Sequence, residues 1–275
     1  MDICNVIELV KRETLRRGYS QKTTKAYCEG IKRFLRVCLK EPKRITKKDI
    51  EDYIDRLVES RSRNTVNLNL AAIKFLMQEI LHKRHFFRIK YCKRGRALPE
   101  VLTKEEVLRL FDSISNPKHR LMVELMYSSG IRVGELVSLK VYDIEFSHGI
   151  GWVRHGKGNK DRMFILADKI KAKLKDYIDK ENIKYFIFKG AKCHISIRTM
   201  QVIVKQAAKK AGIDKNVHPH TLRHSFATHL AENGYTAEAI QPLLGHNSIQ
   251  TTMTYLHMVP KITVKSPFDT LQKKN

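Results

Sequence analysis

A short basic segment divides this chain of 275 residues into two parts. From Lys83 to Arg96 the sequence holds seven lysines and arginines and no acidic residue. A charge run of this kind is usually solvated, and here it is interpreted as a linker. Since domains typically contain ~100–200 residues, the chain is long enough for two of them. The predicted first domain, linker, second domain and tail span residues 1–85, 86–97, 98–260 and 261–275.

Apolar residues recur at helical spacing over most of both parts. The first 85 residues hold four such stretches, with Ser20 and Thr46 as N-caps of the second and third and Asn64 opening the fourth. In the second part Thr103 and Glu106 have the spacing of a capping box. Later helices are predicted over residues 168–180, 196–211, 219–233, 236–244 and 248–257.

The hydrophobic period changes between residues 144 and 166. Short apolar stretches at 144–146, 150–153 and 163–166 are typical of β-strands, and the glycines at 156–160 favour a hairpin tip between the last two. We therefore predict a fold that is mainly α with one small antiparallel β-sheet.

The charge balance points to a polyanionic partner. The formal net charge is +25, and nucleic acid is the commonest partner that neutralises such a surplus. An anionic membrane surface is the weaker alternative, because it usually binds a basic amphipathic helix, whereas these cations are spread along the chain. No apolar stretch approaches the ~20 residues of a membrane span, and from the first residues we expect no secretory leader.

Cysteines and histidines give little sign of a disulfide or a metal site. The five cysteines are odd in number and scattered, which is typical of reduced thiols in the cytoplasm. Histidines gather between His218 and His229, but no cysteine lies close to them and no H-E-x-x-H occurs. Gly151, Gly156 and Lys157 have the spacing of a nucleotide-binding P-loop, but Gly158 replaces its Ser or Thr. We expect neither a metal nor a cofactor.

Several residues could act on an anion, although each alone is more often structural. Pro219 suits the first turn of a helix, which places His220 and Arg223 on one face where backbone N–H groups favour an anion. Arg132 follows a glycine and lies one turn before Glu135, which is expected to orient it. Lys157 lies on the flexible hairpin tip. The remaining candidates are His246 and Tyr255.

In this order and spacing, R…K…H-x-x-R…G-H…Y resembles the tyrosine recombinase (phage integrase) family. The segments that carry the resemblance are GIRVGEL from Gly130, GKGNKDR from Gly156, HTLRHSFATHL from His220 and LGH…TTMTY ending at Tyr255. They look like Xer-type chromosome-dimer resolvases. The resemblance is strong from Leu98 to His257, and looser over the preceding helices, which look like the family's core-binding domain.

The resemblance implies a role for each candidate. Tyr255 would attack the scissile phosphate and form a 3′-phosphotyrosine, and Arg132 and Arg223 would bind its non-bridging oxygens. Lys157 would protonate the leaving 5′-oxygen, His220 would assist proton transfer at the tyrosine, and His246 would hydrogen-bond a phosphate oxygen. Because the enzyme intermediate stores the energy of the phosphodiester, no ATP is needed.

The family architecture implies that two domains clamp double-stranded DNA and that a homo-tetramer joins two sites through a Holliday junction. It also implies that the tail, residues 261–275, docks on a neighbouring protomer. The expected DNA-binding residues are Arg88, Lys90, Lys93, Arg94 and Lys160. A partner recombinase or accessory protein stays open, as does the target sequence.

The sequence leaves three alternatives to chromosome-dimer resolution open. The segment Val264–Asp269 looks more like the tails of integron-type integrases, which favours a mobile-element integrase. A relaxing topoisomerase uses similar chemistry but does not need the four-helix front domain. A non-catalytic DNA-binding protein explains the charge but not the full set of Arg, Lys, His and Tyr.

Overall fold

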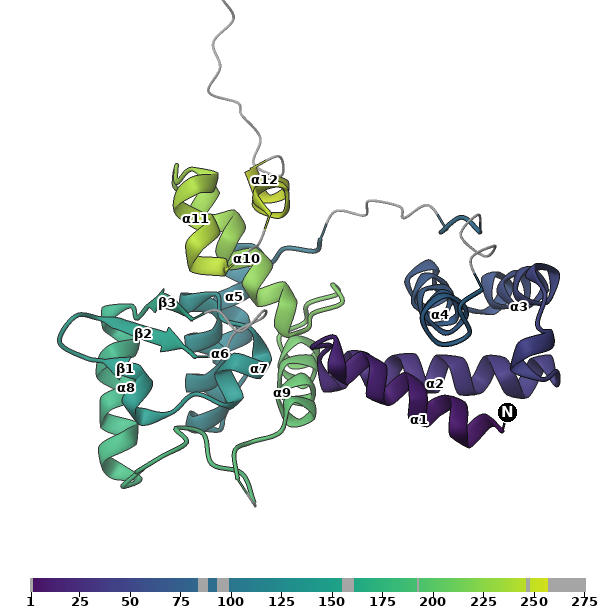
Figure 1. The fold of residues 1–275 in the computed structure, drawn as a ribbon. Helices are drawn as coiled ribbons and strands as arrows, with labels where there is room; N and C mark the ends of the chain where they lie inside the picture. The colour runs from purple at the N-terminus through teal and green to yellow at the C-terminus, as the bar shows by residue number, and fades with distance from the viewer. Residues whose placement is uncertain are drawn as a thin grey trace, which may run out of the picture. The chain divides into compact units, whose positions relative to one another are not determined.

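The computed structural model describes residues 2–83, 89–92, 99–154, 161–191, 193–245 and 248–256. The chain forms two compact units, Met1–Arg96 and Ala97–Asn275 (Figure 1). The division between them falls at the C-terminal end of the basic segment, between Arg96 and Ala97. Among the described residues, no helix combines the length and apolar character needed to cross a membrane.

The first unit is a bundle of helices around one apolar core, which includes Ile31, Phe34 and Ile73. Its elements are α1 (Ile3–Arg16), α2 (Gln21–Cys38), η1 (Pro42–Arg44), α3 (Lys47–Ser60), α4 (Arg63–Phe75) and the π-helical η2 (Leu76–Ile80). The predicted caps at Ser20 and Thr46 are confirmed, the second as a full capping box. The fourth helix was predicted to open at Asn64. It begins at Arg63, with Ser62 as its N-cap.

Part of the predicted linker packs on the first unit. Ile89 is buried in the core of this unit. The side-chain amide of Asn67 on α4 donates to the carbonyl of Cys92 at 3.0 Å and accepts from its backbone N–H at 2.8 Å. Residues 89–92 are therefore anchored rather than free, with Lys90 exposed. Arg88, Lys93 and Arg94 lie outside the described residues.

The second unit is mainly helical with one sheet. Its elements are α5 (Lys104–Asp112), α6 (Pro117–Ser129), α7 (Val133–Val137), η4 (Val141–Asp143), β1 (Ile144–Glu145), β2 (Ile150–Val153), β3 (Arg162–Ile165), α8 (Asp168–Lys180), α9 (Ile197–Lys210), α10 (Pro219–Glu232), α11 (Ala237–Leu244) and α12 (Ile249–Leu256). The three strands form an antiparallel sheet in the order β1-β2-β3. This confirms the predicted fold class, while the short α7 was not predicted.

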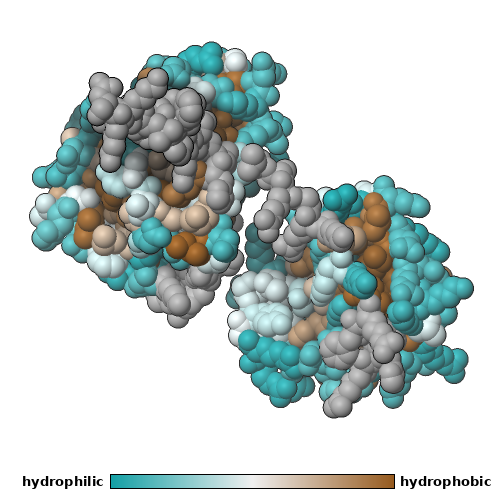
Figure 2. All heavy atoms as spheres, turned by 90° about the horizontal axis from the view of Figure 1, so that it is seen from above, coloured by the Kyte–Doolittle hydropathy of each residue, from teal (hydrophilic) through white to brown (hydrophobic). Residues whose placement is uncertain are grey.

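Gly151, one of the glycines in the P-loop-like spacing, is explained by packing between two strands of the sheet. Gly151 on β2 pairs with Phe164 on β3, and a Cβ at residue 151 would overlap the fully buried Phe164 ring. This ring enters the core that α6 and α8 share with the sheet. Gly151 thus has a packing role. Figure 2 shows hydrophilic residues around the edges of each unit, with hydrophobic residues visible between them.

Candidate active site

Two helices of the second unit end at glycines whose backbone is left-handed. Gly130 ends α6 with φ +62°, and Gly245 ends α11 with φ +59°. A Cβ at residue 130 would overlap the Phe226 ring, and one at residue 245 would overlap the side chain of Arg162. Glycine therefore satisfies both the backbone conformation and the close approach. The last carbonyls of a helix lack helical partners and carry partial negative charge, so these two ends can hold cations.

Three arginines meet at the C-terminal end of α11, and we call Arg132, Arg162 and Arg223 the arginine cluster. Arg162 donates to the carbonyl of Leu243 at 2.9 Å, and Arg132 donates to the carbonyl of Gly245 at 3.2 Å. The carbonyl between them, from Leu244, accepts from Arg223. Three successive carbonyls thus position three guanidinium groups that come from different parts of the chain.

Arg223 is the most deeply buried member of the cluster, with 3% of the residue exposed. It also donates to the carbonyl of Gly130 at 2.6 Å, so it bridges the C-terminal ends of α6 and α11. Burial, followed by the positive charges of Arg132 and Arg162, lowers its pKa to about 9. It remains a cation at neutral pH. A phosphate next to this group would offset the repulsion within the cluster.

Glu135 supplies a negative charge within the cluster. One oxygen accepts from Nη1 of Arg132 at 2.8 Å, and the other accepts from Nη2 of Arg162 at 2.5 Å and from the backbone N–H of Arg132 at 2.7 Å. Burial alone would raise the pKa of Glu135, but the charge of Arg162 and the hydrogen bonds from Arg132 outweigh it and lower the pKa. The predicted orienting contact with Arg132 is therefore present. The partner that sequence reasoning missed is Arg162, at the start of β3.

Histidine and tyrosine rings line the first turns of α10, and we call His218, His220, His224 and Tyr255 the ring row. His218 is the N-cap of α10, and its Nδ1 accepts from the backbone N–H of Thr221 at 3.1 Å. Successive ring centroids along the row are separated by 6.3, 6.5 and 5.6 Å. The row ends where Nδ1 of His224 lies 2.8 Å from the hydroxyl oxygen of Tyr255.

Tyr255 on α12 is 3% exposed and packs with Phe226, Ile240 and Leu244. Burial raises the pKa of its phenol, while the positive charges of Arg223 and Arg132 act in the opposite direction. The positive charges of the arginine cluster therefore act on the hydroxyl group of Tyr255. A phenol becomes a stronger nucleophile when its proton is removed, and neighbouring cations favour the phenolate that results.

Several predicted site residues are not described by the structure. Lys157 and Lys160, predicted to lie at a hairpin tip, and His246, which follows Gly245 in the sequence, lie outside the described residues. In the described part of the chain, no group of three histidines, cysteines or acids could hold a metal ion.

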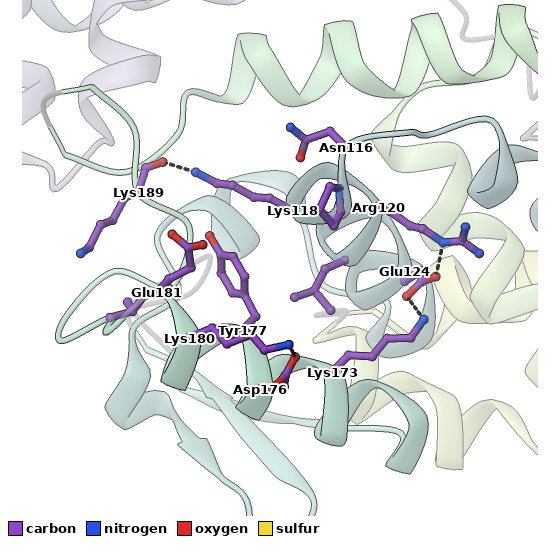
Figure 3. Close-up of a pocket in the computed structure, with 13 residues that line it drawn as sticks. Asn116, Lys118, Arg120, Glu124, Lys173, Asp176, Tyr177, Lys180, Glu181 and Lys189 are labelled. Atoms are coloured by element: carbon purple, nitrogen blue, oxygen red, sulfur yellow. Dashed lines mark hydrogen bonds and ion pairs between the residues drawn. The ribbon is translucent and has the colours of Figure 1, made fainter.

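A cavity of about 630 Å³ lies at the opposite end of α6 from the arginine cluster. Its lining includes Arg120 and Lys173, which both pair with the buried Glu124 (Figure 3). None of the predicted site residues that the structure describes lines this cavity. The candidate active site is therefore the junction of the arginine cluster and the ring row.

Two family models match most of the chain. The phage integrase family matches residues 100–261, and the N-terminal SAM-like domain of phage integrases matches residues 7–85. The chain belongs to the phage integrase family. It is accordingly a tyrosine recombinase, an enzyme of DNA strand transfer, with Xer-like relatives.

Named relatives of this recombinase cover nearly its whole length. It is 34% identical over 271 residues to a tyrosine recombinase of Thermosipho africanus, covering 94% of each chain. It is 34% identical to tyrosine recombinase XerA of Pyrococcus furiosus, covering 89% of this chain and 86% of that one. An integrase/recombinase of Escherichia coli is 31% identical, with 92% of this chain and 90% of that one covered.

A solved structure shares the fold of this recombinase. The XerH site-specific recombinase, crystallised with its difH substrate in a post-cleavage complex, superposes with a TM-score of 0.77 at 20% identity. The match covers 94% of this chain and 81% of that one. At this identity the likeness concerns the fold.

Proposed function

We propose that this recombinase cuts and rejoins double-stranded DNA at specific sites through a 3′-phosphotyrosine at Tyr255. The observation that carries the proposal is that the Tyr255 hydroxyl contacts His224, the residue next to Arg223, while the Tyr255 ring packs with Leu244, whose carbonyl accepts from Arg223. Permanent cations fixed by backbone carbonyls form a site for a phosphate diester, and a phenol beside them supplies the nucleophile.

In the proposed cleavage step, the Tyr255 oxygen forms a bond to phosphorus and the bond from phosphorus to the 5′-oxygen breaks. Negative charge grows on the two non-bridging oxygens, and Arg132 and Arg223 stabilise it. Arg223 suits this role because two carbonyls already fix its orientation. The 5′-hydroxyl of a second strand then attacks the phosphotyrosine and reverses the step, so no external energy is consumed.

Proton transfers are assigned to residues around this centre. Lys157 protonates the leaving 5′-oxygen, His246 donates a hydrogen bond to a phosphate oxygen, and His220 assists proton transfer at the tyrosine. His220 lies on α10 one turn before His224, and partial burial followed by the charge of Arg223 lowers its pKa. It is therefore suited to exchanging a proton without holding a permanent charge.

The proposal extends to the assembly and to the cellular role. Two DNA sites are joined by four copies of this chain through a Holliday junction, and the reaction separates chromosome dimers. Similarity to XerA of Pyrococcus furiosus over nearly the whole chain supports an Xer role. The excess positive charge, with Arg88, Lys90, Lys93, Arg94 and Lys160 as candidate contacts, supports the duplex as the partner.

Integration of a mobile element is the second candidate function. The 31% identity to an Escherichia coli integrase/recombinase supports it, as does the sequence Val264–Asp269 near the C-terminus. The same chemistry serves both functions, so they differ in the sites that the enzyme joins. A dimer resolvase acts on two identical sites, whereas an integrase joins two unlike sites.

The test starts by selecting a binding site from a pool of random duplex DNA. Two direct copies of the selected site are then placed in one supercoiled plasmid, with single-site and site-free plasmids as controls. We expect two smaller circles from the two-site plasmid only. Relaxation of all three plasmids would instead indicate a topoisomerase, and an absence of strand breakage would contradict the proposal. Recombination only between the selected site and an unlike site would favour the integrase.

A further inference from the structure

We propose that His224 is a positioning residue that orients the hydroxyl of Tyr255 for attack on the phosphate. The roles assigned above leave this histidine without a function, although its Nδ1 contacts the reacting oxygen at 2.8 Å. The inference rests on the proposed function, because it takes Tyr255 as the nucleophile.

The local structure fixes both partners of this contact. His220 and His224 are four residues apart on α10 and Arg223 directly precedes His224, so this turn faces both the arginine cluster and α12. On the other side, the Tyr255 ring is held by the apolar side chains of Phe226, Ile240 and Leu244. These apolar side chains set the position of the ring but cannot themselves accept or donate a hydrogen bond to its hydroxyl. The hydrogen bond to His224 restricts that direction.

The contact between His224 and Tyr255 lies beside the arginine cluster. The pKa of Tyr255 is influenced by the charges of Arg223 and Arg132, which are the groups proposed to bind the phosphate. The Tyr255 ring also packs with Leu244, whose carbonyl accepts from Arg223, so the tyrosine and a proposed phosphate ligand share a neighbouring residue. A small change in its orientation would then weaken attack, since reacting atoms must be aligned.

The charge state of His224 suits it to this role. Burial, followed by His220, His218 and Arg223, lowers its pKa to about 4, and Tyr255 is its partner on α12. Near pH 7 the imidazole is therefore neutral and adds no charge to the cationic cluster. A neutral ring offers one nitrogen that donates and one that accepts, so its tautomer can adapt to the hydroxyl.

The same helix supplies a matched control. At the far end of α10, Nδ1 of His229 lies 2.8 Å from the hydroxyl of Tyr127, the same pair of atoms at the same distance. Removing this second hydrogen bond reports what a histidine–tyrosine pair on α10 contributes to stability alone. His229 is buried and His224 is partly buried, and burial is the main cause that lowers the pKa of both.

The experiment uses the full chain and a duplex carrying the selected site with a nick that traps the cleaved product. His224→Ala, His224→Asn, His229→Ala and His229→Asn are compared in single-turnover cleavage at saturating protein. Asparagine places a polar atom where Nδ1 lies but cannot take up a proton. His224→Leu replaces His224→Ala if the latter does not fold, because it fills the space without a hydrogen-bonding atom.

We expect His224→Ala to slow cleavage by about 10- to 100-fold, His224→Asn to restore most of the rate, and the His229 variants to cleave normally. DNA affinity should be unchanged throughout. Cleavage by His224→Ala at the normal rate would overturn the proposal. Equal slowing by Asn and Ala would also overturn it, because the residue would then act by accepting a proton. If the unchanged enzyme forms no adduct, it is the proposed function that fails.

Discussion

The arginine cluster and the ring row meet at α10 but are held in place by different forces. The cluster consists of permanent charges fixed by carbonyls at two helix ends and by Glu135. The ring row consists of aromatic side chains that can change protonation and that contact one another edge to face or at a tilt. In the arginine cluster the charges are kept at an energetic cost, whereas in the ring row burial lowers the pKa of His224 and raises that of Tyr255, so both of these groups are kept neutral.

The two regions meet two different requirements of phosphoryl transfer. A pentavalent phosphorus centre needs donors that are already in place, since reorganising them during the reaction would raise the barrier. Proton transfer needs groups that gain and lose a proton easily. A substitution in the arginine cluster is therefore expected to change catalysis and stability together. A substitution in the ring row should change rates and pH dependence more than stability.

The largest effect is expected from changing the cluster while keeping its charge. Arg223→Lys retains a cation, but a single ammonium group cannot bridge Gly130 and Leu244 and also contact two phosphate oxygens. We expect single-turnover cleavage to fall by about 10²- to 10³-fold with DNA binding retained. The matched control is Arg120→Lys at the other end of α6, where Arg120 pairs with Asp112 and Glu124. An equal loss of rate in both variants would contradict the special role of Arg223.

The second-largest effect is expected from removing the carboxylate of Glu135, which pairs with two members of the arginine cluster. Glu135→Gln leaves Arg132 and Arg162 without their shared carboxylate, so we expect a loss of about 3 kcal/mol in the free energy of unfolding, measured with urea. Glu124→Gln is the control, because Glu124 is also buried between two cations but lies away from the site. Both variants should lose stability, and only Glu135→Gln should also slow cleavage. Normal cleavage by Glu135→Gln would show that Arg132 is oriented by other contacts.

A smaller effect is expected from titrating the ring row. The pKa of His224 is about 4 in the folded protein, below its usual value of 6.5, so the unfolded chain binds the proton first as pH falls. Stability should therefore decrease from pH 6.5 toward pH 4, and this residue should contribute roughly 2 kcal/mol of that loss. Urea unfolding of His224→Asn should show a shallower decrease over this range. Identical pH profiles would mean that His224 is not buried as a neutral ring.

The smallest effect per residue concerns the basic segment, which lies outside both regions. Neutralising Arg88, Lys90, Lys93 and Arg94 should lower the slope of log affinity against log salt by up to about 0.9 for each DNA phosphate that is no longer paired with a cation. The control neutralises the exposed lysines of the α8 region, Lys169, Lys175, Lys180 and Lys184. Equal slopes for the two variants would indicate that the segment is only solvated.

Local sequence rules predicted most of the fold. Helix starts at Ser20, Thr46 and Thr103 follow from side chains that cap their own backbone, and the three strands follow from a change of period. Contacts between residues that are far apart in the sequence could not be predicted from these local rules. The pairing of Asn67 with Cys92 is one example, because an asparagine within a helix gives no sign of a backbone partner 25 residues later.

The same distinction holds for the candidate site. The contact between Arg132 and Glu135 spans three residues and was predictable from spacing. Arg162 joins the cluster only because β3 packs beside the end of α11, 81 residues later in the chain. His224 stood within the recognised H-x-x-R-H sequence, but its partner on α12 is 31 residues away. Helical spacing from His220 was the one signal that could have drawn attention to it.

The central claim, that Tyr255 becomes joined to DNA, is tested most directly by mapping the covalent adduct. The enzyme is incubated with the nicked duplex, denatured, digested with protease and nuclease, and examined by mass spectrometry, alongside Tyr255→Phe. We predict one modified peptide, with a 3′-phosphorylated nucleotide on Tyr255, and no adduct from Tyr255→Phe. An adduct on another residue, or one that persists in Tyr255→Phe, would contradict the account.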